Sequence, residues 1–271
     1  MAEPKRTLPE YASPPVIETY LSVQFLLVKK ITTRHFGRYF EYVKEHYPQL
    51  EIQHPIGQTV EEFGSGVGRV PRVEILTEPD FRCWFIDNSE TRLIQVQRDR
   101  FILNWRKVKD DDVYPRYDKI KPEFQQEWQR FCQFLDRQEL GNPEVNQCEI
   151  TYINHIEVGD GWKSYGELNK IIACWRGTYS GDFLREPESV GLNAHYVLPE
   201  NKGRLHITME PAVRKKDAKE ILQLTLTARG QPGSSRLEDI LLWFDLGHEW
   251  IVRGFTDYTT EKMHKHWGRK L

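Results

Sequence analysis

The segment IQVQRDRFILNWRKV, residues 94–108, decides how the chain folds. Apolar and polar residues alternate on both sides of a short polar turn, which is the pattern of two antiparallel strands joined as a hairpin. In the second strand, this alternation places Leu103 and Trp105 on one face and Asn104 and Arg106 on the other. We therefore predict that the hairpin lies in the centre of a sheet.

Strand and helix patterns continue on both sides of the hairpin. The first half is expected to contain a strand, a helix, short strands and a long helix, at residues 16–28, 32–48, 73–76, 81–87, 92–97, 100–108 and 120–140. The second half repeats this order with a strand, a short helix, three strands and a long helix, at 147–158, 164–175, 190–198, 203–210, 220–228 and 235–255. The expected fold class is therefore α+β.

The repeated order indicates two pseudo-repeats, each reading strand, helix, antiparallel strands, long helix. The predicted parts are a loose N-terminal lead at 1–15, a first α+β half at 16–140 and a second α+β half at 145–271, together forming one compact unit. Each long helix carries a single apolar stripe, so the helices are expected to cover one face of the sheet. This geometry resembles the saddle-shaped and helix-grip folds that are used for binding.

The composition is typical of a soluble globular protein. Hydrophobic residues make up 39% of the 271 residues and charged residues 29%, which disordered chains do not show. The net charge of −2 argues against a strongly basic nucleic-acid binder. No apolar run approaches the roughly 20 residues that cross a bilayer, and residues 1–15 lack the apolar core of a signal peptide. We expect no membrane association and a cytoplasmic location.

Common catalytic and metal-binding motifs are incomplete in this sequence. HEWIV begins like a zinc-protease motif at His248, but Val252 stands where the second histidine is needed. The glycine-rich segment 64–68 precedes Pro71 and a strand instead of a helix, so a flexible loop is favoured over a phosphate site. The histidines of MHKHW, residues 263–267, are expected in a solvated tail. No CxxC pair or GxSxG motif occurs, so no cofactor, metal or catalytic residue is assigned and a non-enzymatic role is favoured.

The stretch TYINHIE, residues 151–157, places polar groups within a long strand. Tyr152 and Asn154 face one side of that strand and His155 the other. Because buried Asn and His need hydrogen-bond partners, a network that fixes the sheet against the last long helix is favoured, and the lining of a pocket is the alternative. Asn104 is expected to bond Tyr152 or Asn154. The candidate polar cluster comprises Asn104, Tyr152, Asn154, His155 and His248.

A basic and aromatic stretch around the hairpin offers a second candidate site. Cationic side chains bind phosphates and aromatic rings stack on bases, so a nucleic-acid contact is one interpretation. The acidic residues 110–112 offset the charge, and a solvated hairpin edge is therefore favoured. The candidate partner or nucleic-acid surface comprises Arg98, Arg100, Trp105, Arg106, Lys107, Tyr114, Arg116 and Tyr117.

Four motifs together resemble the landmarks of a bacterial protein family of about this length. They are IQVQRDRFILNWRK, YPRY, TYINHI and HEWIVRGF, and the resemblance covers residues 13–267. No activity, cofactor or catalytic residue is established for that family, so the resemblance implies none. Its sporadic distribution is similar to that of phage-defence and toxin–antitoxin genes, which implies a context instead of a mechanism.

The function that these observations favour is a non-enzymatic binding or interaction protein of the bacterial cytoplasm. An accessory component of a phage-defence or toxin–antitoxin system is the context that the resemblance implies. The alternatives are a chaperone-like protein that binds unfolded clients and an RNA- or DNA-associated protein, and an enzyme is the least favoured alternative. Another protein is the expected partner, with a second copy of this chain as an alternative.

Overall fold

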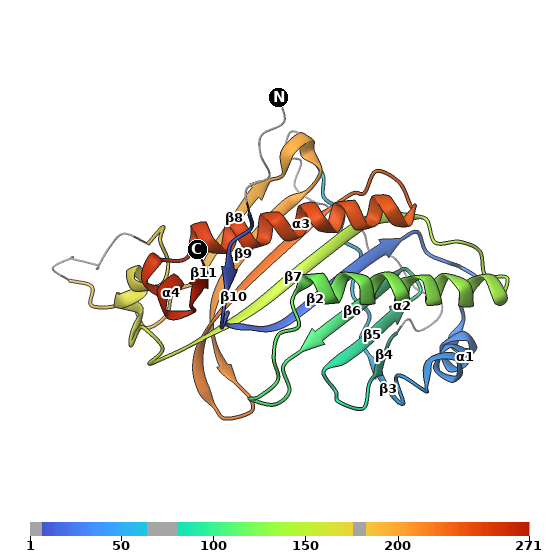
Figure 1. The fold of residues 1–271 in the computed structure, drawn as a ribbon, viewed down its shortest axis with the longest axis horizontal. Coiled ribbons are helices and arrows are strands. Elements are labelled where there is room, and N and C mark those ends of the chain that lie inside the picture. Colours follow the sequence, from blue (N-terminus) through green and yellow to red (C-terminus); the bar gives the residue numbers. More distant parts are fainter. Residues whose placement is uncertain (1–6, 64–80, 176–182, 271) are drawn as a thin grey trace.

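The computed structural model describes residues 7–63, 81–175 and 183–270, and a nine-stranded antiparallel sheet dominates it (Figure 1). The strand order is β3-β4-β5-β6-β2-β7-β10-β9-β8. The first half of the chain supplies β1 (Glu10–Tyr11), β2 (Val16–Phe25), α1 (Thr33–Val43), β3 (Gln49–Gln53), β4 (Arg82–Ile86), β5 (Arg92–Gln97), β6 (Arg100–Arg106) and α2 (Tyr117–Arg137). The second half supplies β7 (Val145–Glu157), η1 (Tyr165–Lys170), β8 (Leu192–Val197), η2 (Pro199–Asn201), β9 (Arg204–Arg214), β10 (Lys219–Gly230), α3 (Leu237–Tyr258), α4 (Glu261–His266) and β11 (Arg269–Lys270).

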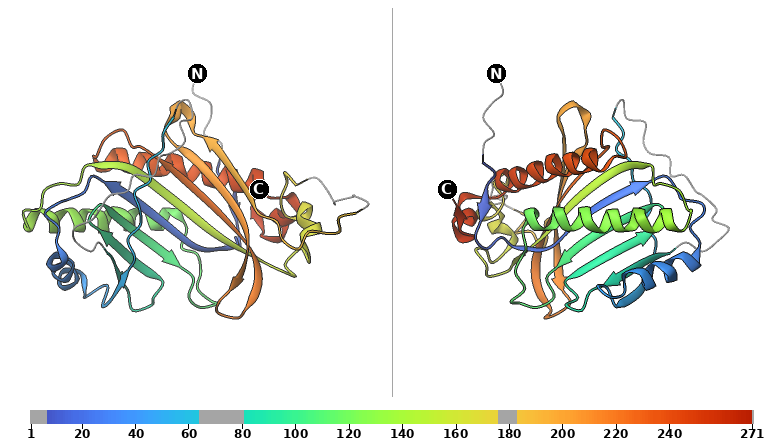
Figure 2. Two further views of the ribbon diagram at one scale, coloured as in Figure 1. Left: turned by 180° about the vertical axis from the view of Figure 1, so that it is seen from behind. Right: turned by 45° about the vertical axis from the view of Figure 1, so that its right-hand side comes forward.

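The predicted α+β class is confirmed, with the long helices α2 and α3 on one face of the sheet (Figure 2). Phe124 of α2 meets Phe244 of α3 with ring centroids 4.9 Å apart, so the two helices touch each other as well as the sheet. The hairpin is β5–β6, and β6 pairs with β5 on one side and β2 on the other. The hairpin is therefore interior sheet, as its sequence predicted.

The two halves of the chain meet inside the sheet. β2 and β7 are antiparallel neighbours, with Tyr20 opposite Thr151 and Ser22 opposite Glu149. One continuous sheet therefore spans both halves. Whether the halves are pseudo-repeats stays a prediction, since pairing and element order do not establish duplication.

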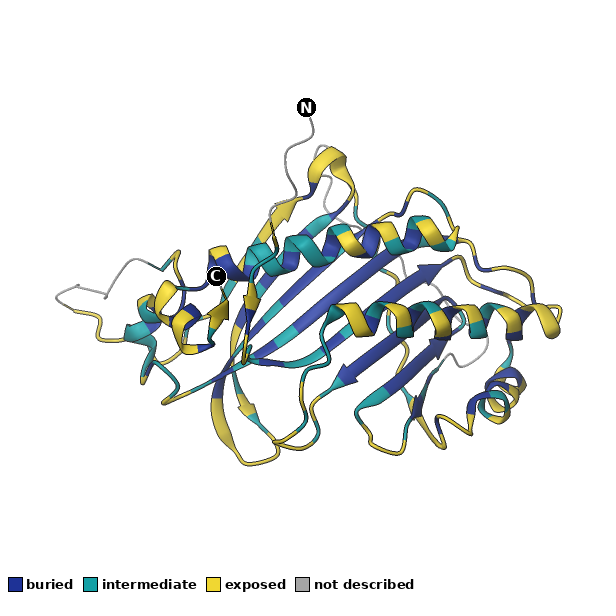
Figure 3. Cartoon of the chain, in the orientation of Figure 1, coloured by how far each residue is buried: buried dark blue, intermediate teal, exposed yellow. Residues whose placement is uncertain are grey.

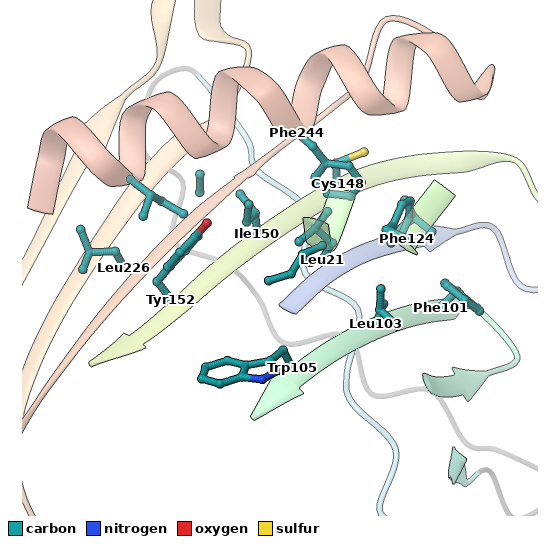
Figure 4. Packing of buried hydrophobic residues seen from close by; sticks show 14 of the residues in the cluster. Leu21, Phe101, Leu103, Trp105, Phe124, Cys148, Ile150, Tyr152, Leu226 and Phe244 are labelled. Atoms are coloured by element: carbon teal, nitrogen blue, oxygen red, sulfur yellow. The ribbon is translucent and has the colours of Figure 1, made fainter. Parts of the chain in front are cut away.

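The apolar core lies between the sheet and the two long helices. Phe101 on β6 contacts Phe131 of α2 at a centroid distance of 5.2 Å, and Phe124 joins the same cluster (Figure 4). Burying each such ring contributes about 1.5–3 kcal/mol to folding. The outward faces of α2 and α3 are exposed, whereas the strands beneath them are buried (Figure 3).

Two glycines allow α3 to lie close to the sheet. A Cβ atom on Gly247 would lie 2.8 Å from Cγ2 of Ile150 on β7, and one on Gly254 would lie 2.7 Å from Cδ2 of Leu205 on β9. Both separations are shorter than carbon atoms tolerate, so a side chain at either position forces the helix or its neighbour to move. Because the glycines are seven residues apart, they share one face of the helix.

The ends of the chain are packed, which corrects two predictions. Residues 7–15 are not a loose lead, because β1 pairs with β11 and Tyr11 is only 4% exposed. The C-terminal segment is not a solvated tail, because α4 buries His264 against the Thr259 hydroxyl at 2.9 Å, whereas His266 is exposed as expected. The pattern also missed β3, a short and mostly exposed edge strand. The predicted strand 73–76 and the glycine-rich segment 64–68 lie outside the described residues.

We expect Gly247→Ala to lower the free energy of unfolding by about 1–3 kcal/mol, because the added methyl overpacks the contact between α3 and β7. Urea denaturation monitored by tryptophan fluorescence measures this change. Gly37→Ala is the matched control: a Cβ there meets no atom within 4 Å, and helix propensity predicts a gain of about 0.5–1 kcal/mol. Equal stability changes in both variants would contradict the close packing at Gly247.

Candidate functional site

A pocket of about 980 Å³ lies on the helix-covered face. The N-terminal segment 7–16, the start of α2, the second half of α3 and the strands β7 and β10 form its walls. Apolar side chains, including Leu226, Ile251 and Phe255, make up much of the lining. The volume is in the range of pockets that hold small ligands.

The polar part of the pocket centres on Tyr152 and His248. Strand alternation directs Tyr152 to the α3 side of β7, beyond Ile150 (Figure 4). His248 follows Gly247, whose close approach to Ile150 brings this turn of α3 down to the sheet. The Tyr152 hydroxyl then lies 3.0 Å from Nδ1 of His248 and accepts a hydrogen bond from the Tyr114 hydroxyl at 2.9 Å.

An aromatic stack continues this cluster toward α2. The rings of Tyr117 and His248 are nearly parallel, with centroids 3.9 Å apart. The Tyr117 hydroxyl donates to Oδ1 of Asp245 at 2.9 Å, and Lys121 pairs with the same carboxylate at 2.7 Å. The imidazole is therefore held both by a ring face and by a hydroxyl.

His248 and Tyr152 are both uncharged at neutral pH. Burial lowers the pKa of His248 to about 4, although Asp245 and Asp118 act in the opposite direction. Burial also raises the pKa of Tyr152 well above its ordinary value, and Tyr114 adds to this shift. Because Tyr152 accepts from Tyr114, its own proton is directed to Nδ1, and the neutral imidazole then carries its proton on Nε2.

The predicted polar cluster is only partly brought together. Tyr152, Asn154 and His248 line the pocket, and Asn154 donates to the Leu224 carbonyl at 3.0 Å. His155 points to the opposite side of β7, as alternation predicted, where it contacts Gln223 at 3.4 Å.

Asn104 does not belong to the pocket. It lies on the other face of the sheet, where it accepts a hydrogen bond from Gln95 at 2.7 Å and donates to Glu18 at 2.7 Å. The prediction that Tyr152 or Asn154 would be its partner is wrong, because Asn104 on β6 and these two residues on β7 have opposite orientations in the sheet.

The predicted basic and aromatic surface is divided between two faces. Arg100 is 5% exposed on the polar face, whereas Trp105 is 3% exposed among the core residues of the helix face. Arg106 donates to the Glu90 carbonyl at 2.9 Å, Arg98 to that of Lys29 at 3.5 Å, and Lys107 is exposed in the loop after β6. The remaining members line the pocket: Tyr114, Arg116 and Tyr117.

The sequence patterns missed a second polar region, on the sheet face opposite the helices. Its residues are buried, although they alternate with the core residues along the central strands. They include Gln24, Gln97, Asp99, Arg100, Gln147 and Glu149. No signal in the sequence identified this region, because Gln and Arg at alternate positions of a strand also fit a solvated face.

No group of three or more potential metal ligands occurs within residues 7–63, 81–175 and 183–270. Over the same ranges, every helix is too short or too polar to cross a membrane. No family model, curated protein or solved structure matches the chain. Its function is therefore inferred from the geometry of the pocket itself.

Acid is expected to destabilise the protein partly through His248. Its folded pKa of about 4 lies below the unfolded value of 6.5, so the unfolded chain binds the proton first as the pH falls. When the pH falls from 6.5 to 4, the free energy of unfolding should therefore decrease by about 1–3 kcal/mol less in His248→Gln than in wild type. Urea denaturation at a series of pH values measures this. His54→Gln, at an exposed position, is the control, and identical pH profiles for all three proteins would contradict the burial of His248.

Proposed function

We propose that this chain is a non-enzymatic binding protein whose ligand is a small molecule held in the pocket between α2, α3 and the N-terminal segment. The observation that carries the proposal is the pocket itself, a partly open hollow of about 980 Å³ in which apolar and aromatic side chains alternate with polar and charged ones. Such a combination is the usual form of a ligand site, since apolar walls supply affinity and polar groups fix orientation.

The polar groups favour a ligand that is planar, largely apolar and neutral. The Tyr117–His248 stack presents flat aromatic surface, and Nε2 of neutral His248 is a hydrogen-bond donor for which the described residues show no acceptor. Two acidic groups of the lining have a cationic partner, since Lys121 pairs with Asp245 and Lys270 with Glu10. The Arg116 side chain donates instead to the backbone carbonyls of Tyr11 and Ala12.

The pKa shifts support binding over proton transfer. A general acid or base works best when its pKa is close to the working pH. The pKa of His248 is about 4, and burial raises the pKa of Tyr152 well above 10. A role in a phage-defence or toxin–antitoxin system is a further proposal, and it rests on the resemblance of the sequence motifs alone.

2-Naphthol and naphthalene test the ligand class, because they share a planar ring system and differ by one hydroxyl. We expect both to bind saturably, measured by ligand-observed NMR. His248→Phe should lower the affinity for 2-naphthol by about fivefold to tenfold, which corresponds to the loss of one hydrogen bond. The affinity for naphthalene should not change.

A pocket-filling variant provides the control for this experiment. Val252→Trp places an indole in the pocket and should abolish binding of both probes, whereas Leu242→Trp, at an exposed position of α3 outside the pocket, should not. Absence of saturable binding to wild type, or unchanged binding to Val252→Trp, would overturn the proposed function.

A further inference from the structure

The sheet face opposite the helices carries a buried polar surface that the proposed pocket does not use. Gln24 and Ser22 of β2, Arg100 of β6, and Gln147 and Glu149 of β7 are each less than 8% exposed. Burying this many polar groups is costly unless each finds a partner. Some partners come from the sheet, as Arg229 does for Glu149, and others come from one segment of the chain that has no regular secondary structure.

Residues 54–62, here called the strap, lie across this polar face (Figure 2). Gln97 of β5 accepts a hydrogen bond from the Ile56 amide at 2.8 Å and donates to the Ile56 carbonyl at 3.0 Å. Arg100 donates to the Gly57 carbonyl at 3.1 Å, and Gln24 accepts from the Thr59 amide at 2.9 Å. These contacts hold the strap by its backbone, so they do not depend on the side chains of the strap.

One strap side chain adds charge recognition. The carboxylate of Glu61 is 2% exposed and lies between Arg204, His206 and Arg229, at 2.5, 2.7 and 3.4 Å. Burial alone would raise the pKa of Glu61, but the hydrogen bonds from His206 and Arg204 lower it to about 2. The adjacent Glu62 has an exposed side chain and contributes its backbone carbonyl, which accepts from Arg204 at 2.8 Å.

The polar face has more hydrogen-bonding capacity than the strap uses. The Ser22 hydroxyl, Nε2 of Gln147 and Nε of Arg100 are buried and have no partner among the residues that the structure describes. All three are donors, and the side chains that carry them are at most 5% exposed. Each buried donor without a partner calls for an explanation, and a bound chain other than the strap would supply one on this face.

We propose that the polar face is a groove for an extended acidic segment of a partner protein, and that the strap occupies this groove in cis until the partner segment replaces it. Backbone recognition by Gln24, Gln97 and Arg100 fits any extended chain. The site of Glu61 selects a carboxylate, because release of the strap leaves Arg204 and His206 without their acidic partner. The groove is separate from the helix-side pocket, so this inference does not depend on the proposed ligand.

The test uses a fluorescently labelled peptide with the sequence HPIGQTVEEF, residues 54–63, and the full-length chain. Glu61→Gln removes the charge that holds the strap, whereas Glu62→Gln alters the neighbouring exposed carboxylate and is the matched control. The strap competes with the peptide for the groove, so only molecules whose strap has left the groove can bind the peptide. Because Glu61→Gln increases the fraction of such molecules, it should bind the peptide at least about tenfold more tightly than wild type or Glu62→Gln. A peptide with Gln at position 61 should not bind the Glu61→Gln chain with this higher affinity, because it lacks the carboxylate.

A folded Glu61→Gln variant that does not bind the peptide would overturn the proposal. If that variant does not fold, hydrogen exchange of the wild-type chain tests whether the strap leaves the groove. The Ile56 and Thr59 amides should then exchange by local release, at least about a hundredfold faster than the amides that pair β7 with β10. Exchange of the strap at the same rate as these strands would mean that it is a permanent part of the fold, and would overturn the proposal.

Discussion

The contact between Gly247 of α3 and Ile150 of β7 is the constraint on which the functional site depends. It brings the helix close enough for His248 to reach the Tyr152 hydroxyl and, on the other side, to stack on Tyr117. A larger residue at position 247 would lift this turn of α3 away from the sheet and separate these groups. The contact of His248 with Tyr152 and the burial that lowers the pKa of His248 therefore have the same origin.

The alternation of the central strands then gives the molecule two different faces. On β2, β6 and β7, one set of side chains forms the apolar core beneath α2 and α3, and the intervening set is mostly polar. An antiparallel sheet commonly leaves its second face to water. Here the central part of that face is buried, and its glutamine and arginine side chains bind the backbone of residues 54–62. Each face thus has its own binding chemistry: apolar enclosure on one, and recognition of backbone and carboxylate on the other.

The sequence was sufficient for the periodic elements and insufficient for features that depend on tertiary contacts. The stripes of α2 and α3 and the alternation around Leu103 identified the helices, the hairpin and the sidedness of its strands. The packing of Tyr11 was missed because a two-residue strand has no periodicity, and its partner β11 lies at the other end of the chain. The polar face was missed because Gln97 and Arg100 follow the pattern of a solvated strand, and the covering segment has no regular secondary structure. Asn104 was given the wrong partner because alternation fixes the side of a residue within its own strand, whereas register decides which neighbours share that side.

Native mass spectrometry of the chain purified from its own cell, without denaturation, tests the central claim most directly. We expect a noncovalent, uncharged small molecule bound at one per chain, and the loss of that molecule from the Val252→Trp variant, whose added indole fills the pocket. Retention of the same bound mass by that variant would place the ligand elsewhere and contradict the account. A wild-type chain that carries no small molecule under conditions that preserve its fold would contradict it as well.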